Sequence, residues 1–215
     1  STLLASSAAS DVYKRQTYNF EEDIIASAKT ICKRYKGNQA HAEYLEQMAG
    51  KFFDLLQKYH GLGERERLLL RLAAILHDCG KFISMSAPGE CAYQIIMSTE
   101  ILGISHMERE MVACIVRYNT MELPNFREFD GKLGNDEYLI VMKLAAILRV
   151  CNALDRSHRQ KFADMKLTIK DSNIVITTAY PDNITLEKKT LKDKQDFFEE
   201  VYGLGFEIKQ KKKKQ

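Results

Sequence analysis

The stretch Leu72–Lys81, with the sequence LAAILHDCGK, decides the fold of this chain. Its first five residues and the apolar residues before them leave almost no polar face, so the helix that contains them must be buried nearly all round. Gly80 ends that helix. The residues before this glycine include His77 and Asp78, an imidazole beside a carboxylate, and both can reach one divalent cation. We therefore expect a central helix that carries a metal-binding pair at its end.

Helical periodicity continues on both sides of this stretch. Apolar residues recur every three or four positions, and glycines or polar loops separate the periodic segments. The segment that begins at Ser105 opens with Ser-His-Met-Glu, a capping box. LAAIL occurs again at Leu144–Leu148, and we interpret this as a packing requirement because paired alanines let helices approach closely. The pattern predicts helices over residues 20–35, 39–59, 64–78, 90–102, 105–118 and 136–156.

The sequence pattern changes after Phe162. Lys166–Lys170 alternates between polar and apolar residues, a turn-forming triplet follows, and Ile174–Thr178 is rich in β-branched residues. These features predict a β-hairpin. A short amphipathic helix over Leu191–Tyr202 can cover the hairpin, and Phe206–Lys209 can supply a third strand.

The chain divides into three parts. The sequence predicts a mostly α protein, in which a helical bundle over residues 17–162 is followed by a small α+β unit (hairpin, helix, strand) over residues 163–215. Residues 1–16 fit neither part. They begin with small-residue filler, and Asp11–Gln16, DVYKRQ, is also what a common transposase-end sequencing adapter encodes. We expect residues 1–16 to be a non-native segment and the natural protein to begin further upstream.

Two more side chains belong with His77 and Asp78. His41 lies on the apolar stripe of the helix predicted over residues 39–59, and Asp155 lies on the inward face of the last long helix. A buried histidine is usually hydrogen-bonded to backbone, and an aspartate near a helix end is usually solvated. A carboxylate that faces a core is nevertheless costly unless it is paired or binds a cation. Two imidazoles and two carboxylates on packed helices predict a site for one divalent metal, with Mn, Fe, Mg and Zn not distinguished.

The order His41, His77–Asp78, Asp155 is similar to that of the HD superfamily of metal-dependent phosphohydrolases. More widely, residues 20–211 resemble the C-terminal half of the exopolyphosphatase/guanosine-pentaphosphatase (Ppx/GppA) phosphatase family, in which the helical bundle is an HD-type domain. The resemblance is carried by separated blocks in the family's order: Arg65–Leu70, Ala73–Lys81, Leu102–Ser105, Glu108–Glu110, Ile115–Tyr118, Ala153–Ser157 and Phe197–Gly203.

The resemblance implies that hydrolysis and polyphosphate binding belong to different domains of the family's proteins. In the family, phosphoanhydride hydrolysis takes place in two N-terminal ATPase-like lobes with glycine-rich phosphate loops, and the glycines of this chain form neither G-x-x-x-x-G-K nor G-x-G-x-x-G. The HD-type domain instead helps to hold long polyphosphate and supports dimerisation. Asn119 stands where relatives often have histidine, and Glu90–Ala92 lacks the histidine that two-metal enzymes place there. Both departures argue against a second metal site.

Basic residues near the HD pair are the candidates for phosphate contacts. Polyphosphate carries about one negative charge per unit, so a surface that binds it needs several Lys or Arg side chains. Each such residue, taken alone, is more readily explained as part of a solvated surface. Grouped around one predicted cavity, they form the expected phosphate-binding set: Lys81, Arg117, Arg149, Arg156 and Arg159.

Composition limits the setting in which the chain works. Its 5 cysteines are scattered and form no CxxC pair, which favours a reducing cytoplasm over a disulfide framework. No apolar run reaches the roughly 18 residues needed to cross a bilayer, so we expect no membrane partner. The net charge is +3, and we interpret the terminal run Lys211–Lys214 as solvated rather than as a nucleic-acid surface.

Three interpretations of function remain open. The first is a binding and assembly module for polyphosphate or guanosine pentaphosphate in a homodimeric phosphatase, without turnover in this chain. The second is an HD phosphohydrolase that acts in its own right on a nucleotide or phosphoester, with His77 and Asp78 as catalytic residues. The third is a structural domain whose cluster is a relic. The family resemblance favours the first, and the complete ligand set keeps the second open.

Overall fold

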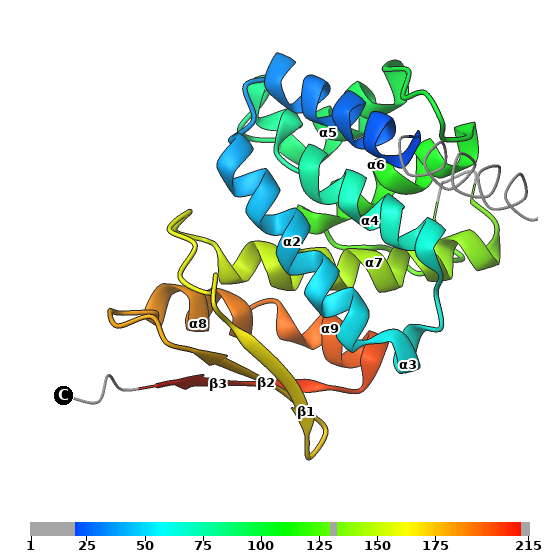
Figure 1. The fold of residues 1–215 in the computed structure, drawn as a ribbon. Helices are drawn as coiled ribbons and strands as arrows, with labels where there is room; N and C mark the ends of the chain where they lie inside the picture. The colour runs from blue at the N-terminus through cyan, green and yellow to red at the C-terminus, as the bar shows by residue number, and fades with distance from the viewer. Residues whose placement is uncertain (1–19, 130–132, 212–215) are drawn as a thin grey trace, which may run out of the picture.

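The computed structural model describes residues 20–129 and 133–211, and its helices confirm the mostly α fold class (Figure 1). The segment predicted to be non-native, residues 1–16, lies outside the described residues. Within the described part, no helix is both long and apolar enough to cross a membrane. The helical domain consists of a helix over residues 20–34, α2 (Gln39–Leu55), α3 (Gln57–His60), α4 (Glu64–Leu76), the 3-10 helix η1 (Cys79–Phe82), α5 (Pro88–Ser98), α6 (His106–Thr120) and α7 (Asn135–Leu154).

Helix α4 runs through the middle of this domain, as its apolar sequence predicts. Residues Leu68–Leu76 are buried except for Arg71, whose Nε donates to Glu46 on α2 at 2.8 Å. Helices α2, α6 and α7 pack around α4. The two LAAIL segments, Leu72–Leu76 and Leu144–Leu148, are at most 1% exposed at every residue. Both segments therefore lie in the centre of the core.

The helix predicted over residues 39–59 is broken at Leu56. The side chain of His60 folds back onto the end of α2, where its Nε2 donates to the carbonyl oxygen of Phe53 at 2.9 Å. Its Nδ1 accepts the backbone amide of Leu62 at 2.9 Å. The His60 ring therefore packs onto the end of α2, and α3 is a single turn that ends at Gly61, whose φ is +66°.

The C-terminal unit confirms the predicted hairpin and third strand. Strands β1 and β2 are antiparallel, and they are joined through Asp171 and Ser172, which have the positive φ that a two-residue turn requires. Strand β3 pairs with β2 in parallel, with Phe206 opposite Ile174. The single helix predicted over residues 191–202 is corrected to two. The elements are β1 (Lys166–Lys170), β2 (Asn173–Thr178), α8 (Thr185–Lys192), α9 (Gln195–Tyr202) and β3 (Gly205–Gln210).

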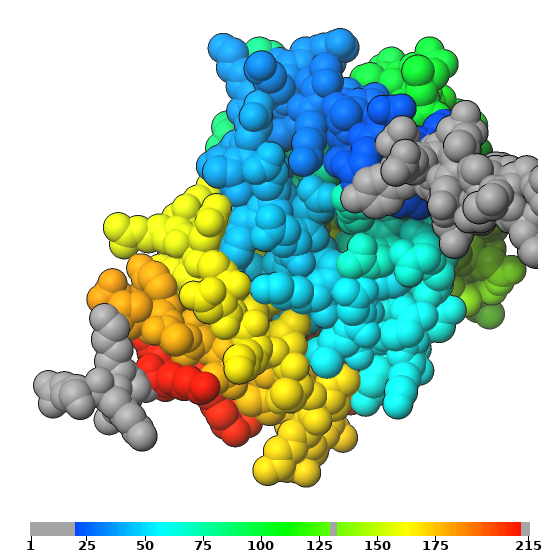
Figure 2. Space-filling view, viewed as in Figure 1, coloured from blue at the N-terminus to red at the C-terminus, as the bar shows by residue number. Residues whose placement is uncertain are grey.

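The C-terminal unit shares its core with the helical domain. Helices α8 and α9 lie between the sheet and α7 (Figure 1). Ile174 and Ile176 of β2 and Phe198 of α9 are fully buried. The hydroxyl of Tyr202 donates to the backbone carbonyl of Lys143 on α7 at 2.9 Å. Figure 2 shows the unit, coloured yellow to red, in contact with α2 across this face. The loop after α7 connects the two units, and its residues Arg156, His158, Arg159 and Gln160 are exposed.

Candidate metal centre

The predicted ligands lie together where α2, α4 and α7 meet. His41 is in the first turn of α2, His77 and Asp78 directly follow α4, and Asp155 caps the C-terminus of α7. Their exposed fractions are 2%, 5%, 9% and 1%, in that order. Burial of titratable side chains is costly unless they have partners, so the partner of each atom decides what this group can do.

Asp155 orients His41. The Nδ1 atom of His41 lies 2.7 Å from Oδ2 of Asp155, and since a carboxylate only accepts, the imidazole proton lies on Nδ1. The other carboxylate oxygen, Oδ1, accepts the backbone amide of Gln160 at 2.7 Å. Both oxygens of Asp155 are thus engaged inside the protein. The other ring nitrogen of His41, Nε2, is buried without a hydrogen-bond partner.

The ring of His77 is also oriented by a hydrogen bond from its Nδ1, and here the acceptor is a backbone carbonyl. Its Nδ1 donates to the carbonyl oxygen of Ala74 at 2.7 Å. Its Nε2 is buried without a hydrogen-bond partner and lies 3.2 Å from Oδ1 of Asp78. Burial lowers the pKa of His77 to about 4, so the ring is neutral at pH 7. A neutral imidazole is the form that binds a metal.

Asp78 supplies the negative charge. Its Oδ1 lies 2.7 Å from Nζ of Lys81. Burial raises the pKa of the Asp78 carboxyl, but the interaction with His77 and the hydrogen bond from Lys81 outweigh burial and hold the pKa below its ordinary value. The carboxylate is therefore ionised at neutral pH.

A third histidine, His158, was missed by the sequence reasoning. Its ring stacks on that of His41, with 3.8 Å between centroids and 12° between planes. One ligand atom from each of His41, Asp78 and His158 lies within 4.8 Å of the others, which makes these three, among the described residues, a group that can hold a metal ion. His158 has a φ of +53°, which no local sequence pattern indicates. The sequence signal that could have identified His158 was its position three residues after the predicted ligand Asp155.

We call His41, His77, Asp78 and His158 the histidine cluster. The rings of His41 and His158 and the carboxylate of Asp78 form the group that could hold a metal ion, and His77 lies beside them with its Nε2 3.2 Å from Oδ1 of Asp78. A buried nitrogen that has a lone pair and no donor is an unsatisfied acceptor, and the cluster contains two. A cation would satisfy both. Imidazole nitrogen with one carboxylate oxygen suits Zn, Mn or Fe, and the carboxylate also accepts Mg.

The family of the chain follows from comparison with protein families. The model described as Ppx/GppA phosphatase, domain III, matches residues 25–196. The chain belongs to the Ppx/GppA phosphatase family. The matched span contains the whole histidine cluster and all of α8, and α9 begins within it. No protein with a curated description matches the chain.

Three of the five basic residues proposed to bind phosphate in this Ppx/GppA domain are close in sequence to residues of the histidine cluster. Lys81 is ion-paired with Asp78. Arg156 and Arg159 are exposed and flank His158.

The other two basic residues have partners elsewhere. Arg117 is ion-paired with Glu90 and lines one surface hollow. Arg149 lines a different hollow, where its Nε donates to the carbonyl oxygen of Tyr118 at 2.6 Å and its guanidinium lies 4.3 Å from the ring centroid of Phe197. The structure therefore does not gather all five basic residues around one cavity.

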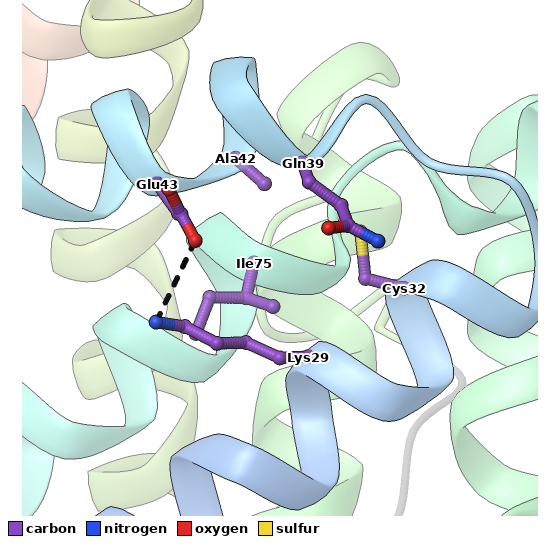
Figure 3. Close-up of a pocket in the computed structure, with 6 residues that line it drawn as sticks. All are labelled: Lys29, Cys32, Gln39, Ala42, Glu43 and Ile75. Carbon is purple, nitrogen blue, oxygen red and sulfur yellow. Dashed lines mark ion pairs between the residues drawn. The ribbon is translucent and has the colours of Figure 1, made fainter.

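A small cavity of about 30 Å³ lies on another side of α2 (Figure 3). Lys29 and Glu43 approach each other across its mouth with 3.9 Å between their charged atoms. Its volume exceeds the about 10–15 Å³ that one water molecule needs, and it is too small for a larger ligand. None of the predicted site residues contributes to its lining, which consists of Lys29, Cys32, Gln39, Ala42, Glu43 and Ile75.

Proposed function

We propose that this Ppx/GppA domain binds the phosphate chain of polyphosphate or guanosine pentaphosphate, without hydrolysing it, at a divalent metal ion held by the histidine cluster. One observation carries the proposal: the buried Nε2 atoms of His41 and His77 have no hydrogen-bond partner and lie beside the ionised Asp78. Buried polar atoms without any hydrogen-bond partner are rare, and a bound ion is one way to satisfy them.

The residues around the cluster fit this role. A divalent ion supplies a positive centre for phosphoryl oxygens. Asp155 fixes the tautomer of His41, so that its Nε2 lone pair is available. Lys81, Arg156 and Arg159 add the further positive charges that an anionic chain requires.

A titration with polyphosphate tests the proposal. Replacing Arg156 and Arg159 together with Ala should weaken binding at least about tenfold at low salt, and affinity should fall steeply as salt is added. The matched control replaces Lys188 and Lys189 with Ala, because this pair is exposed on α8 and carries the same two charges. Equal affinities for the two double variants would contradict the proposed phosphate surface.

Hydrolysis by the cluster itself is the second candidate function. The neutral imidazole of His77 beside the ionised carboxylate of Asp78 provides the kind of side chains that a metal-dependent phosphohydrolase needs, and these two residues would carry the chemistry. Phosphate release from polyphosphate and guanosine pentaphosphate, with Mg or Mn present, separates the two functions. We expect no release. Turnover that Asp78→Ala abolishes would replace the binding function with the hydrolytic one.

We also propose that the domain takes part in a homodimer. The supporting observation is a group of exposed apolar side chains at and after the end of η1: Phe82 is 50% exposed, Ile83 59% and Met85 77%. Adjacent exposed apolar residues are typical of interaction sites. Sedimentation should show a dimer that Ile83→Glu converts to a monomer, whereas Leu186→Glu on α8 should leave it intact. A monomeric wild-type chain would contradict this assignment.

The cysteines support a reducing, cytoplasmic setting for this function. All five are free, and four of them are buried. Burial raises the pKa of Cys79 and Cys114 to about 12, which keeps both thiols protonated and unreactive.

A further inference from the structure

The loop that carries His158 has an unfavourable backbone conformation. His158 and Gln160 have φ values of +53° and +52°, in the left-handed region that residues other than glycine rarely adopt. Within the loop, the amide of His158 donates to the carbonyl oxygen of Asp155 at 2.9 Å, and the amide of Gln160 donates to the Asp155 carboxylate. A backbone of this kind persists only when the surrounding structure holds it.

Glu187 on α8 forms side-chain hydrogen bonds with residues of this loop. It is 0% exposed, although most of α8 faces solvent. Its Oε1 accepts the hydroxyl of Ser157 at 2.5 Å, and its Oε2 accepts the ammonium group of Lys161 at 3.0 Å. Lys161 also donates to the carbonyl oxygen of Asn183 at 2.8 Å. Glu187 therefore binds residues on both sides of His158.

The side chain of His158 has few contacts of its own. It is exposed on one side, and its Nδ1 lies 3.4 Å from the amide nitrogen of Asn38, the N-cap of α2. The oxygen of the same Asn38 amide accepts the backbone amide of His41 at 3.1 Å. One long hydrogen bond and a ring stack do not fix an exposed imidazole, so the position of His158 depends on the loop.

We propose that Glu187 is a positioning residue that holds His158 against His41 in the histidine cluster, so that the C-terminal unit sets the affinity of the metal centre for its ion. The consequence for metal affinity rests on the proposed function. The placement of the His158 ring does not, because it is a property of the chain without an ion.

A purely structural role for Glu187 makes different predictions. In that role the buried Glu187–Lys161 pair only joins α8 to the loop, and its loss lowers stability while the imidazoles of His41 and His158 remain stacked. In the positioning role, the stack is lost while the rest of the protein stays folded.

The first experiment follows the histidine ring protons by NMR in the metal-free chain. Two imidazoles stacked at 3.8 Å shield each other, so His41 and His158 should show upfield-shifted signals in the wild type. Glu187→Gln should remove these shifts and leave the other resonances dispersed. Glu207→Gln is the matched control, since it makes the same chemical change at an exposed carboxylate of the same unit. Unchanged His41 and His158 signals in Glu187→Gln would overturn the proposal.

The second experiment titrates the same proteins with Zn²⁺. Glu187→Gln should bind about tenfold more weakly than the wild type, as expected for a residue that orients a ligand, and Glu207→Gln should bind equally well. In a His158→Ala background, Glu187→Gln should have no further effect, because Glu187 acts through His158. An additional tenfold loss in that background would overturn the proposal.

A second variant keeps the test decisive if Glu187→Gln does not fold. Ser157→Ala removes only the hydroxyl that donates to Glu187 and should change the His158 signals and Zn²⁺ affinity in the same direction. Wild-type His41 and His158 signals in Ser157→Ala would then overturn the proposal. A wild-type chain that binds no Zn²⁺, but whose stack is lost in Glu187→Gln, would contradict the proposed function and support the positioning role.

Discussion

His41 donates its Nδ1 proton to Asp155 over 2.7 Å, although 114 positions of sequence separate the two residues. Both side chains are 1% exposed. The bond therefore joins the start of α2 to the end of α7 at a point that water does not reach. It also determines which imidazole nitrogen faces the rest of the histidine cluster.

This bond makes Asp155→Asn a sharp test of how the cluster works. An amide in place of the carboxylate holds the His41 ring less firmly and no longer favours the Nδ1–H tautomer. We expect Zn²⁺ affinity to fall about 10- to 100-fold, measured by titration with a competing chelator. Asp171→Asn, in the exposed turn between β1 and β2, should keep wild-type affinity. Wild-type affinity in Asp155→Asn would mean that this orientation does not matter for the ion.

His77 gives the metal-free chain a pH-dependent stability. Its pKa is about 4 in the folded state, below the value of 6.5 for a free ring, because burial disfavours the charged form. The folded state is then fully stabilised above pH 6.5 and loses stability as the pH falls from 6.5 toward 4. The loss amounts to about 3 kcal/mol at the low end.

Urea unfolding at a series of pH values measures this effect. His77→Gln should reduce the slope of unfolding free energy against pH between 6.5 and 4, whereas His106→Gln on the surface should not. Some slope should remain, because burial also lowers the pKa of His60. Identical slopes for the wild type and His77→Gln would exclude the buried, neutral state of the ring.

Gly80 should be intolerant of a side chain. A Cβ at this position would collide with the backbone carbonyl of Pro88 and the backbone amide of Ala92, neither of which is a flexible group. We expect Gly80→Ala to lower the unfolding free energy by about 1–3 kcal/mol or more, as overpacking does. At Gly61, a Cβ meets nothing within 4 Å, and the only cost is its φ of +66°. Gly61→Ala should therefore cost about 1 kcal/mol, and a larger loss there than at Gly80 would contradict the packing argument.

The capping box at the start of α6 should contribute measurably to stability. Ser105 accepts the amide of Glu108 at 3.2 Å, and Glu108 accepts the amide of Ser105 at 2.7 Å. Ser105→Ala should lower the unfolding free energy by about 1 kcal/mol in urea denaturation. Ser98→Ala, at an exposed position at the end of α5, should be neutral. If the two variants have the same unfolding free energy, the capping box does not contribute to stability.

The sequence was sufficient for the features that depend on local periodicity. Apolar spacing located the helices, and the Ser105–Glu108 box was readable because capping involves residues three positions apart. The same periodicity placed His41 and Asp155 on inward faces, which is why the structure brings both to His77 and Asp78.

Features that depend on long-range contacts could not be read in this way. His158 reaches the cluster through a backbone conformation that nothing in its neighbours specifies. Glu187 stands in the polar sequence Leu-Glu-Lys-Lys, which looks like a solvated helix face, and only the approach of Ser157 and Lys161 explains its burial. Gly80 looked like a helix terminator, but its larger role is to let α5 approach η1.

The place of Glu187 along the chain has a consequence for biosynthesis. The polypeptide emerges from the ribosome N-terminus first, so His41 and His77 are made long before α8. Until α8 is made, Ser157 and Lys161 lack the carboxylate that they bind in the finished protein. A nascent chain that stops short of α8 would contain its histidines without holding His158 in place. If Glu187 positions His158 as proposed, the His158 ring takes its place against His41 only after α8 has been made.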